Sequence, residues 1–335
     1  MNMLACALLF AALSVSAAPV SYHVAAPVQI GGEGGWDYLT VDPEAQRIYV
    51  SHATRVEVVD LAAGKVMGAI PDTPGVHGIA LAPKLGRGYV SSGRANSVTV
   101  FDLKTLKTIE QIAVGQNPDS ILYDSVSNRV FTFNGRSKDA SVIDAASGKV
   151  VSTIPLGGKP EFSVSDDKGK VWVNIEDTHE MAEIDAAKAV VTKRYNLDGC
   201  EDPSGLAIDR AHRRLFSVCG NKVMTISDPD AGKVVAHVPI GEGSDGAGFD
   251  PGTGLAFSSN GEGTLTVVQQ NAGKYEVAQT VTTERGARTM AVDPTTHNVY
   301  LPTARFGPAP AATPQQPRPR PAPEPGSFHL VVVSQ

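Results

Sequence analysis

The sequence is poor in the features that mark several large protein classes. It has three cysteines and two tryptophans in 335 residues, and its acidic side chains outnumber its basic ones, which gives a formal net charge of -6. A chain without a basic excess has no broad positive surface for phosphate backbones, so we do not expect a nucleic-acid partner. It has no Cys-x-x-Cys-His, Gly-x-Ser-x-Gly or His-Glu-x-x-His motif. Covalent haem attachment, the α/β-hydrolase nucleophile turn and the zinc-protease helix are therefore excluded.

Long apolar runs are also scarce, and the one that opens the chain is short. Residues 4–15 are almost wholly apolar and are followed by small residues, a pattern typical of a secretory leader and too short to span a bilayer. We predict cleavage after Ala17, so that residues 1–17 are a signal peptide and residues 18–335 the mature domain. Cys6 is then removed, and no transmembrane segment is expected.

What the sequence does have is a short aromatic phrase that returns seven times. Its aromatic residues are Tyr49, Tyr89, Phe131, Trp172, Phe216, Phe257 and Tyr300. Each copy follows a short apolar segment whose anchor residues are Asp42, Ala82, Asp124, Asp166, Asp209, Asp250 and Asp293, at steps of 40, 42, 42, 43, 41 and 43 residues. Because there is almost no helical period, this regular spacing indicates propeller blades.

Two further segments complete each repeat. A third strand ends in an aspartate in five repeats, at Asp60, Asp102, Asp144, Asp185 and Asp228. We expect these carboxylates to accept backbone N–H bonds and set the following turn, often Gly-Lys, before a fourth strand. The sequence thus predicts an all-β, seven-bladed propeller with four antiparallel strands per blade, and the seven aromatics are expected in the core between blades.

The chain ends predict how the ring closes. The seventh repeat has three strands and stops at Gln335, whereas an unmatched β-segment at residues 24–30 precedes the first complete repeat. We expect this N-terminal strand to complete the last blade, which also limits open sheet edges. Residues 307–326 contain eight prolines and are predicted to be an extended, mobile insert between the second and third strands of blade seven.

These phrases carry a family resemblance. The aromatic-Val-Ser strands, third strands such as Val98-Thr99-Val100-Phe101-Asp102 and the Gly-Lys turns resemble degenerate YVTN repeats, as in YncE-like extracytoplasmic propellers. The resemblance covers the whole mature chain. It implies a seven-bladed propeller exported from a bacterium, hence a periplasmic or secreted protein, and it brings no shared set of catalytic residues.

Counting along the repeats places a set of polar residues at one mouth of the channel. In a propeller, the loop into a blade's first strand and the loop between its second and third strands lie on one face. The residues five positions before the anchors are Asp37, His77, Asp119, Glu161, Ser204, Asp245 and Arg288. The second-to-third-strand loops add His52, Arg94, Arg136, Glu176, Asp177, His179 and Asn260. Carboxylates gathered at a channel mouth suit a cation or a small polar ligand, although a solvated rim without a ligand is the alternative.

The two remaining cysteines predict a bridge. Cys200 lies in the loop into blade five and Cys219 at the end of that blade's second strand, so antiparallel pairing brings both to the same face. In an oxidising compartment an even pair favours a disulfide, and two separate thiols are the alternative.

Function is less determined than fold. Our first hypothesis is an exported, monomeric, non-enzymatic scaffold that binds a small ligand, a cation or a protein partner at the acidic mouth. A divalent cation is the one cofactor considered, and no residue is assigned as catalytic or metal-ligating. The alternative is a lactonase-like hydrolase, with His77 and Asp37 or Asp119 as the base and Arg288 holding the oxyanion. A third hypothesis is docking through the proline-rich insert.

Overall fold

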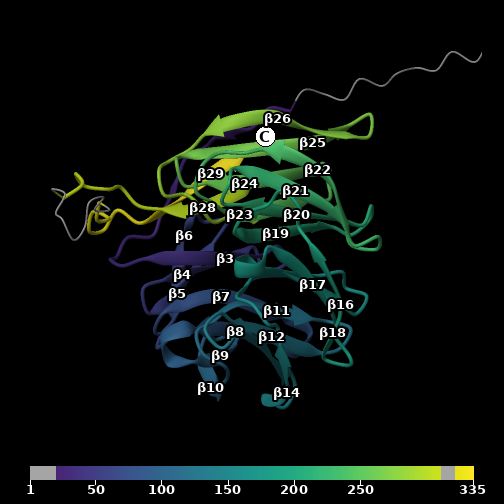
Figure 1. Cartoon of the computed structure of the whole chain (residues 1–335). Coiled ribbons are helices and arrows are strands. Elements are labelled where there is room, and N and C mark those ends of the chain that lie inside the picture. The colour runs from purple at the N-terminus through teal and green to yellow at the C-terminus, as the bar shows by residue number, and fades with distance from the viewer. Residues whose placement is uncertain (1–19, 311–320) are drawn as a thin grey trace, which may run out of the picture.

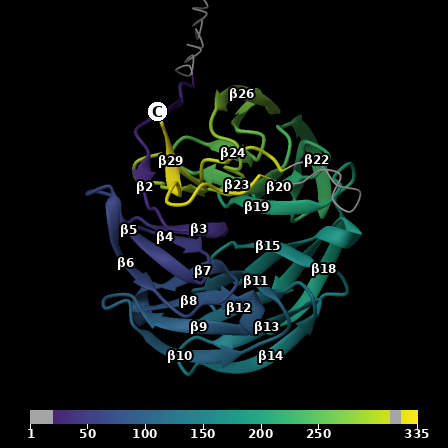
Figure 2. The same ribbon diagram turned by 90° about the vertical axis from the view of Figure 1, so that its left-hand side faces the viewer.

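The computed structural model describes residues 20–310 and 321–335, and over these residues the chain forms seven antiparallel sheets around a common axis (Figure 1, Figure 2). The predicted signal peptide, residues 1–17, lies outside the described residues, as does the centre of the proline-rich insert. Six sheets have four strands each in sequence order. The predicted all-β, seven-bladed propeller is therefore confirmed.

The strands repeat regularly along the chain. Blades one and two are β3 Trp36–Asp42, β4 Arg47–His52, β5 Arg55–Asp60, β6 Lys65–Ile70, β7 Val76–Ala82, β8 Arg87–Ser92, β9 Ser97–Asp102 and β10 Thr108–Ala113. Blades three and four are β11 Pro118–Asp124, β12 Arg129–Asn134, β13 Asp139–Asp144, β14 Lys149–Pro155, β15 Pro160–Ser165, β16 Lys170–Ile175, β17 Glu180–Asp185 and β18 Val190–Asn196. Blades five and six are β19 Pro203–Asp209, β20 Arg214–Cys219, β21 Val223–Asp228, β22 Lys233–Pro239, β23 Ser244–Asp250, β24 Leu255–Asn260, β25 Thr264–Asn271 and β26 Lys274–Thr282.

Blade seven is closed by the N-terminal segment. Its own strands are β27 Ala291–Val292, β28 Val299–Thr303 and β29 His329–Ser334, and both β1 His23–Val24 and β2 Val28–Gln29 pair with β29. The predicted outer strand is thus present but divided in two, because Pro27 between the halves has no N–H to give to the ladder. Figure 2 shows β2 beside β29 at this blade.

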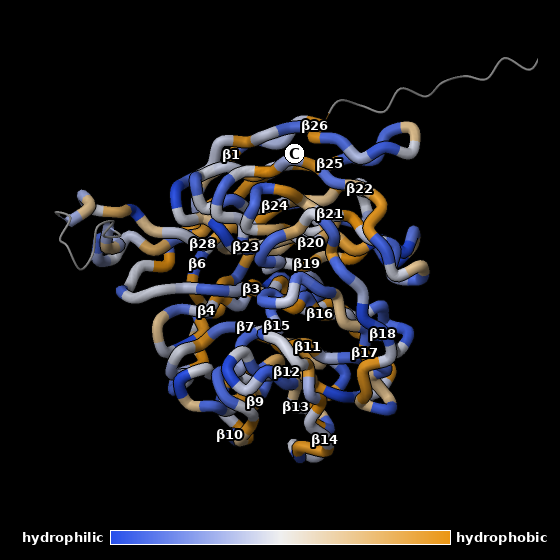
Figure 3. The backbone as a smooth tube through the Cα atoms, in the orientation of Figure 1, coloured by the Kyte–Doolittle hydropathy of each residue, from blue (hydrophilic) through white to orange (hydrophobic). Residues whose placement is uncertain are grey.

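The hydrophobic core is a ring of separate clusters between neighbouring blades, and the described residues contain one such cluster at each of the seven blade interfaces. The aromatic residues of the repeated phrase are at most 5% exposed, which confirms their predicted place in the core. Figure 3 shows apolar colour concentrated on strands and hydrophilic colour on the connecting turns. A blade buries both of its faces, so each blade is held by its neighbours.

The third-strand aspartates act as predicted. Asp60 Oδ1 accepts the N–H of Ala63 at 2.8 Å, and Asp102 Oδ1 accepts that of Thr105 at 2.7 Å. The equivalent bonds form at the other three positions, Asp144, Asp185 and Asp228. Each carboxylate therefore fixes the turn between the third and fourth strands.

The disulfide prediction is also confirmed. Cys200, before β19, is bonded to Cys219 at the end of β20, with Cα atoms 5.4 Å apart. The bond fixes the loop into blade five against that blade's second strand.

The insert was predicted to be extended and mobile; its described ends are anchored, and its centre lies outside the described residues. Phe306 and Pro323 form an antiparallel bridge, and Gly307 N–H donates to Ala322 O at 3.1 Å. Gly326 N–H donates to Gly32 O at 2.9 Å, which ties the insert to the glycine-rich loop before β3. Within the described residues, no helix has the length and apolarity that a membrane crossing needs.

Candidate functional site

The first strand of each of blades one to six is irregular at the rim residue. Pairing with the second strand breaks between Trp36 and Leu39 in blade one and between Pro118 and Ile121 in blade three, and similar breaks occur in the other four. A bulge leaves residues unpaired and redirects their side chains. The rim residues in these breaks are Asp37, His77, Asp119, Glu161, Ser204 and Asp245. Figure 2 shows the strands that carry them innermost in the ring.

Five of the seven predicted rim residues form one ionic chain across the mouth. His77 Nδ1 donates to Asp37 Oδ2 at 2.6 Å and lies 3.6 Å from Asp119 Oδ1. Arg288, in the loop before β27, places Nη2 3.6 Å from Asp37 Oδ1 and donates from Nε to Asp245 Oδ2 at 2.7 Å. Asp37 therefore connects the imidazole to the guanidinium, and blades one, two, three, six and seven meet in this chain.

The other two rim residues are held differently. Glu161 accepts from Lys159 Nζ at 2.6 Å, and the same ammonium group also bonds Glu176. Ser204 Oγ donates to the backbone oxygen of Ser244 at 3.3 Å and contacts none of the charged rim groups. The structure thus brings five of the predicted rim residues together in the ionic chain, whereas Ser204 bonds the backbone of the next blade.

The charges at the mouth do not balance. Five carboxylates face three cationic groups, which leaves an excess of two negative charges when all are ionised. The carboxylates are Asp37, Asp119, Glu161, Glu176 and Asp245, and the cations are His77, Lys159 and Arg288. Burial of such an excess is costly, because a partly dry site screens repulsion poorly.

The pKa values of the buried groups follow from this excess. Burial alone would lower the pKa of His77, but its hydrogen bond to Asp37 and the nearby carboxylate charges outweigh burial and raise it to about 9. Burial raises the pKa of Asp119 to about 7; the charge of His77 opposes this rise, and repulsion from Asp37 and Asp245 adds to it. Burial and the charge of Asp119 raise the pKa of Glu161 to about 8. His77 is therefore an imidazolium at neutral pH, and it lies near two carboxyl groups, Asp119 and Glu161, whose pKa values are raised.

One oxygen in this chain is left without a partner. Asp119 Oδ1 is buried and accepts no hydrogen bond, since 3.6 Å to His77 Nδ1 is too long for one. One donor atom from each of Asp37, His77 and Asp119 lies within 4.8 Å of the other two. Two carboxylates and an imidazole at this spacing can bind one metal ion.

An aromatic pair lies next to the charged residues of the mouth. Tyr38 and Phe162 pack edge to face with centroids 5.1 Å apart. Burial and the surrounding carboxylates hold the pKa of the Tyr38 phenol well above its usual range. Phe162 also lines a pocket of about 440 Å³, where apolar side chains such as Ile79 and Ile121 lie beside charged ones such as Asp42 and Arg210.

Sequence reasoning missed the residues that hold the rim backbone. Ser51 Oγ accepts the N–H of Asp37 at 2.8 Å, and Ser259 Oγ donates to the backbone oxygen of Arg288 at 2.5 Å. Ser91 likewise bonds the backbone oxygen of Asp119, and Asn174 Nδ2 donates to that of Ser204 at 2.9 Å. All four occupy the second position after the aromatic residue of the repeated phrase, so their recurrence was the available signal.

Two of the predicted loop residues do not reach the mouth. His52 is 1% exposed, stacks on Phe328 at 4.2 Å and places Nδ1 3.4 Å from Glu57. Asn260 is buried and donates within its own hairpin to Thr264 and Thr266. Both end a second strand and are drawn into the blade by pairing with the third.

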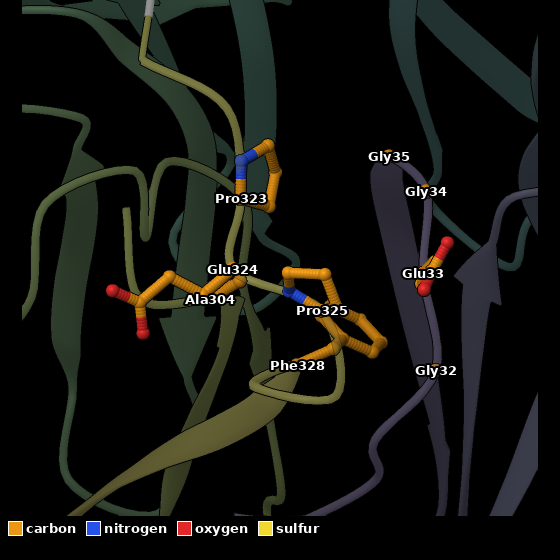
Figure 4. Close-up of a pocket in the computed structure, with 9 residues that line it drawn as sticks. All are labelled: Gly32, Glu33, Gly34, Gly35, Ala304, Pro323, Glu324, Pro325 and Phe328. Atoms are coloured by element: carbon orange, nitrogen blue, oxygen red, sulfur yellow. The ribbon is translucent and has the colours of Figure 1, made fainter. Parts of the chain in front are cut away.

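Two pockets flank the glycine-rich loop at residues 32–35 on this face. One, of about 370 Å³, lies between that loop and the base of the insert, where Pro325 and Phe328 face the loop (Figure 4). The other, of about 350 Å³, is lined by Trp36, Asp37, His77, Arg94 and Arg288 among others. The second pocket therefore opens directly onto the ionic chain.

Comparisons with known proteins support the fold but identify no activity. No family model matches the sequence, and no curated protein matches it. Among solved structures, the chain is similar to a Kuenenia stuttgartiensis hydrazine synthase chain, with a TM-score of 0.68 and 16% sequence identity, over 87% of this chain and 96% of that one. At that identity the likeness supports the propeller fold alone.

Proposed function

We propose that this protein is a propeller binding scaffold whose ligand at the channel mouth is a divalent cation. Asp37, His77 and Asp119 would supply three donor atoms, and the remaining coordination positions would face the mouth. A mixed set of imidazole and carboxylate suits Mn²⁺ or Zn²⁺ better than Ca²⁺, which takes oxygen donors. The excess of negative charge at the mouth supports a cation over an anion.

The observation that carries this proposal is Asp119 Oδ1, a buried carboxylate oxygen without a hydrogen-bond partner, beside donors on Asp37 and His77. Buried polar atoms in proteins are normally bonded, and an exception needs a reason. A cation would satisfy this oxygen. It would also displace the proton on His77 Nδ1, so binding releases a proton and strengthens with rising pH.

The finer proposal concerns location and family. We propose an exported, YncE-like propeller of the YVTN-repeat type, periplasmic or secreted. The seven aromatic phrases support the family, and the apolar leader supports export. The Cys200–Cys219 bond supports an oxidising compartment.

The lactonase-like alternative is less well supported by the geometry. A general base must be deprotonated at the working pH, and the raised pKa of His77, about 9, keeps it charged near neutrality. The other ring nitrogen of His77, Nε2, lies against Gly93: a Cβ at that glycine would be 2.8 Å from Nε2. This leaves little space for a substrate at Nε2. Arg288 already forms ion pairs with Asp245 and Asp37, so few of its N–H groups remain to bind an oxyanion.

Calorimetric titration of the mature, chelator-treated protein with MnCl₂, ZnCl₂ and CaCl₂ tests the cation proposal. We expect one site that prefers Mn²⁺ or Zn²⁺ and whose affinity increases from pH 6 to pH 8. Asp119→Asn should weaken binding by about 100-fold, because it removes a charged ligand.

The matched control is Glu242→Gln. Glu242 is an exposed carboxylate in the loop before β23, on the same face, and pairs only with Lys222 at 2.8 Å among the described residues. Its loss should leave the affinity unchanged. Absence of binding by all three cations, or an equal loss in both variants, would refute the proposal.

A further inference from the structure

The pocket between the glycine-rich loop and blade two has a charge opposite to that of the channel mouth beside it. Its volume is about 350 Å³, and two guanidinium groups, Arg94 and Arg288, are among its lining residues. Arg288 is engaged by Asp245 and Asp37, whereas Arg94 makes no ion pair with any residue of 20–310 or 321–335. Residues 1–19 and 311–320 contain no acidic residue. Arg94 therefore brings an uncompensated positive charge to the pocket wall.

The stem of Arg94 is fixed against the backbone of its neighbour. Gly75 has φ +67, and a Cβ there would lie 2.6 Å from Arg94 Cγ and 2.9 Å from Arg94 N. Gly93 N–H donates to Gly75 O at 2.8 Å, which holds the turn that carries Arg94. A side chain at position 75 would displace the arginine, so glycine is what allows Arg94 to lie along this wall.

The opposite wall is equally well defined. Ala53 N–H donates to Gly35 O at 2.8 Å, and a Cβ at Gly34 would lie 2.5 Å from Ala53 Cβ. Trp36 follows directly and packs on Phe328 at 5.3 Å. With Val76, these groups give the pocket an apolar part of its lining in addition to its two guanidiniums. A preformed pocket with an apolar wall and a few polar groups is typical of small-molecule sites.

We infer that this pocket binds a small organic acid, with its carboxylate on Arg94 and Arg288 and its apolar body against Trp36, Ala53 and Val76. A planar guanidinium suits a carboxylate because it can give two parallel N–H bonds. The site adjoins the proposed cation site and does not require a bound cation. Both share Asp37 and His77 as wall residues, so an acid bound here would lie next to the cation.

The blade repeat provides a matched control residue. Arg136 follows Gly135 in the second-to-third-strand loop of blade three, as Arg94 follows Gly93 in blade two. Arg136 is exposed, makes no ion pair with the described residues and lines none of the pockets above. Removing either arginine changes the net charge of this face equally.

Sodium benzoate is the probe, with benzamide as its uncharged counterpart, titrated into chelator-treated protein. The chain has two tryptophans, and Trp172 is fully buried beneath Arg213 in blade four. We expect benzoate to shift the indole N–H signal of Trp36 in a ¹H–¹⁵N spectrum and to leave that of Trp172 in place, with assignment by Trp36→Phe. Arg94→Gln should weaken benzoate binding by about 10-fold or more, and Arg136→Gln should not change it.

Three results would overturn the inference: no shift with benzoate at millimolar concentration, equal shifts with benzamide, or equal losses in the two arginine variants. The folded state of each variant is checked by its thermal midpoint, which should match the wild type because both arginines are exposed. Asp119→Asn, which tests the cation site, should leave benzoate binding in place. Failure of one proposal can therefore be told from failure of the other.

Discussion

Both ends of the inner strands carry aspartates, and the two ends use them differently. At the turn end, Asp250 is fully buried and accepts bonds from Gly252 N–H at 2.9 Å and Thr253 Oγ1 at 2.8 Å, while His297 Nδ1 of the next blade lies 2.7 Å away. At the mouth, Asp119 Oδ1 is buried with no hydrogen bond. The same residue type is fully satisfied at one end of the strand and left partly open at the other.

The difference comes from where the partners originate. A turn aspartate finds its donors two or three residues further along its own chain, as Asp42 does with the N–H of Ala45 at 3.1 Å. A mouth carboxylate extends from a bulge, and most of its charged neighbours, of both signs, come from other blades, as His77 does for Asp37 and Arg288 for Asp245. The carboxylates at the turn end therefore stabilise the fold. At the mouth, charges remain without full compensation, and a bound ligand can stabilise them.

The largest effect should come from removing a turn aspartate. Asp250→Ala leaves the Gly252 N–H, the Thr253 hydroxyl and His297 without their acceptor, and we expect the free energy of unfolding to fall by about 3–5 kcal/mol. Urea unfolding followed by circular dichroism measures this loss. The Mn²⁺ affinity should stay within a factor of two or so of the wild type. A loss below about 1 kcal/mol would mean that Asp250 contributes no more to stability than an exposed carboxylate at the mouth does.

The second-largest loss of stability should come from removing the Cys200–Cys219 disulfide on the mouth side. Cys200→Ala combined with Cys219→Ala releases a loop closed across 19 residues, and the loop-entropy model predicts a loss of about 3 kcal/mol. Unfolding of the wild type in the presence of a phosphine reductant should show the same loss. If reduction frees two thiols without changing the unfolding midpoint, the bond does not stabilise the mouth.

The smallest effect is a pH-dependent gain from removing a mouth carboxylate. The folded pKa of Asp119, about 7, lies above the ordinary 3.8, so its ionisation costs stability progressively from about pH 4 to pH 7, and the full cost is present above pH 7. The folded pKa of His77, about 9, lies above 6.5, so its stabilisation is complete below pH 6.5 and lost through pH 9. We expect wild-type stability to fall between pH 5 and pH 9, and Asp119→Asn to recover about 1 kcal/mol more at pH 8.5 than at pH 5.

Unfolding midpoints at pH 5, 7 and 8.5 for the wild type, Asp119→Asn and Glu242→Gln provide this measurement. Glu242 is exposed and lies outside the ionic chain, so its variant should follow the wild-type curve. If Asp119→Asn were as destabilising at pH 8.5 as Asp250→Ala, the contrast between the two strand ends would be lost.

Much of the fold could be predicted because it repeats. The anchors from Asp42 to Asp293 recur at nearly constant steps, and each repeat is one blade, so the count of seven and the outer N-terminal strand followed. The division of that strand at Pro27 and the anchored ends of the insert did not follow, since they depend on contacts with β29 and with Gly32. Of the rim residues, counting found Asp37 and Arg288 but could not separate them from Ser204.

By itself, the sequence determined the strand positions and predicted an acidic rim, because hydrophobic period and repeat length fix strand positions in any propeller. It also assigned His52 and Asn260 to that rim, and the structure instead buries both within their blades. Only the tertiary structure decided which rim groups touch, that Asp119 lacks a partner and that Arg94, unlike Arg136, lines a pocket. Those outcomes depend on residues from different blades, whose separation in space is set by ring closure and by bulges that local pattern does not encode.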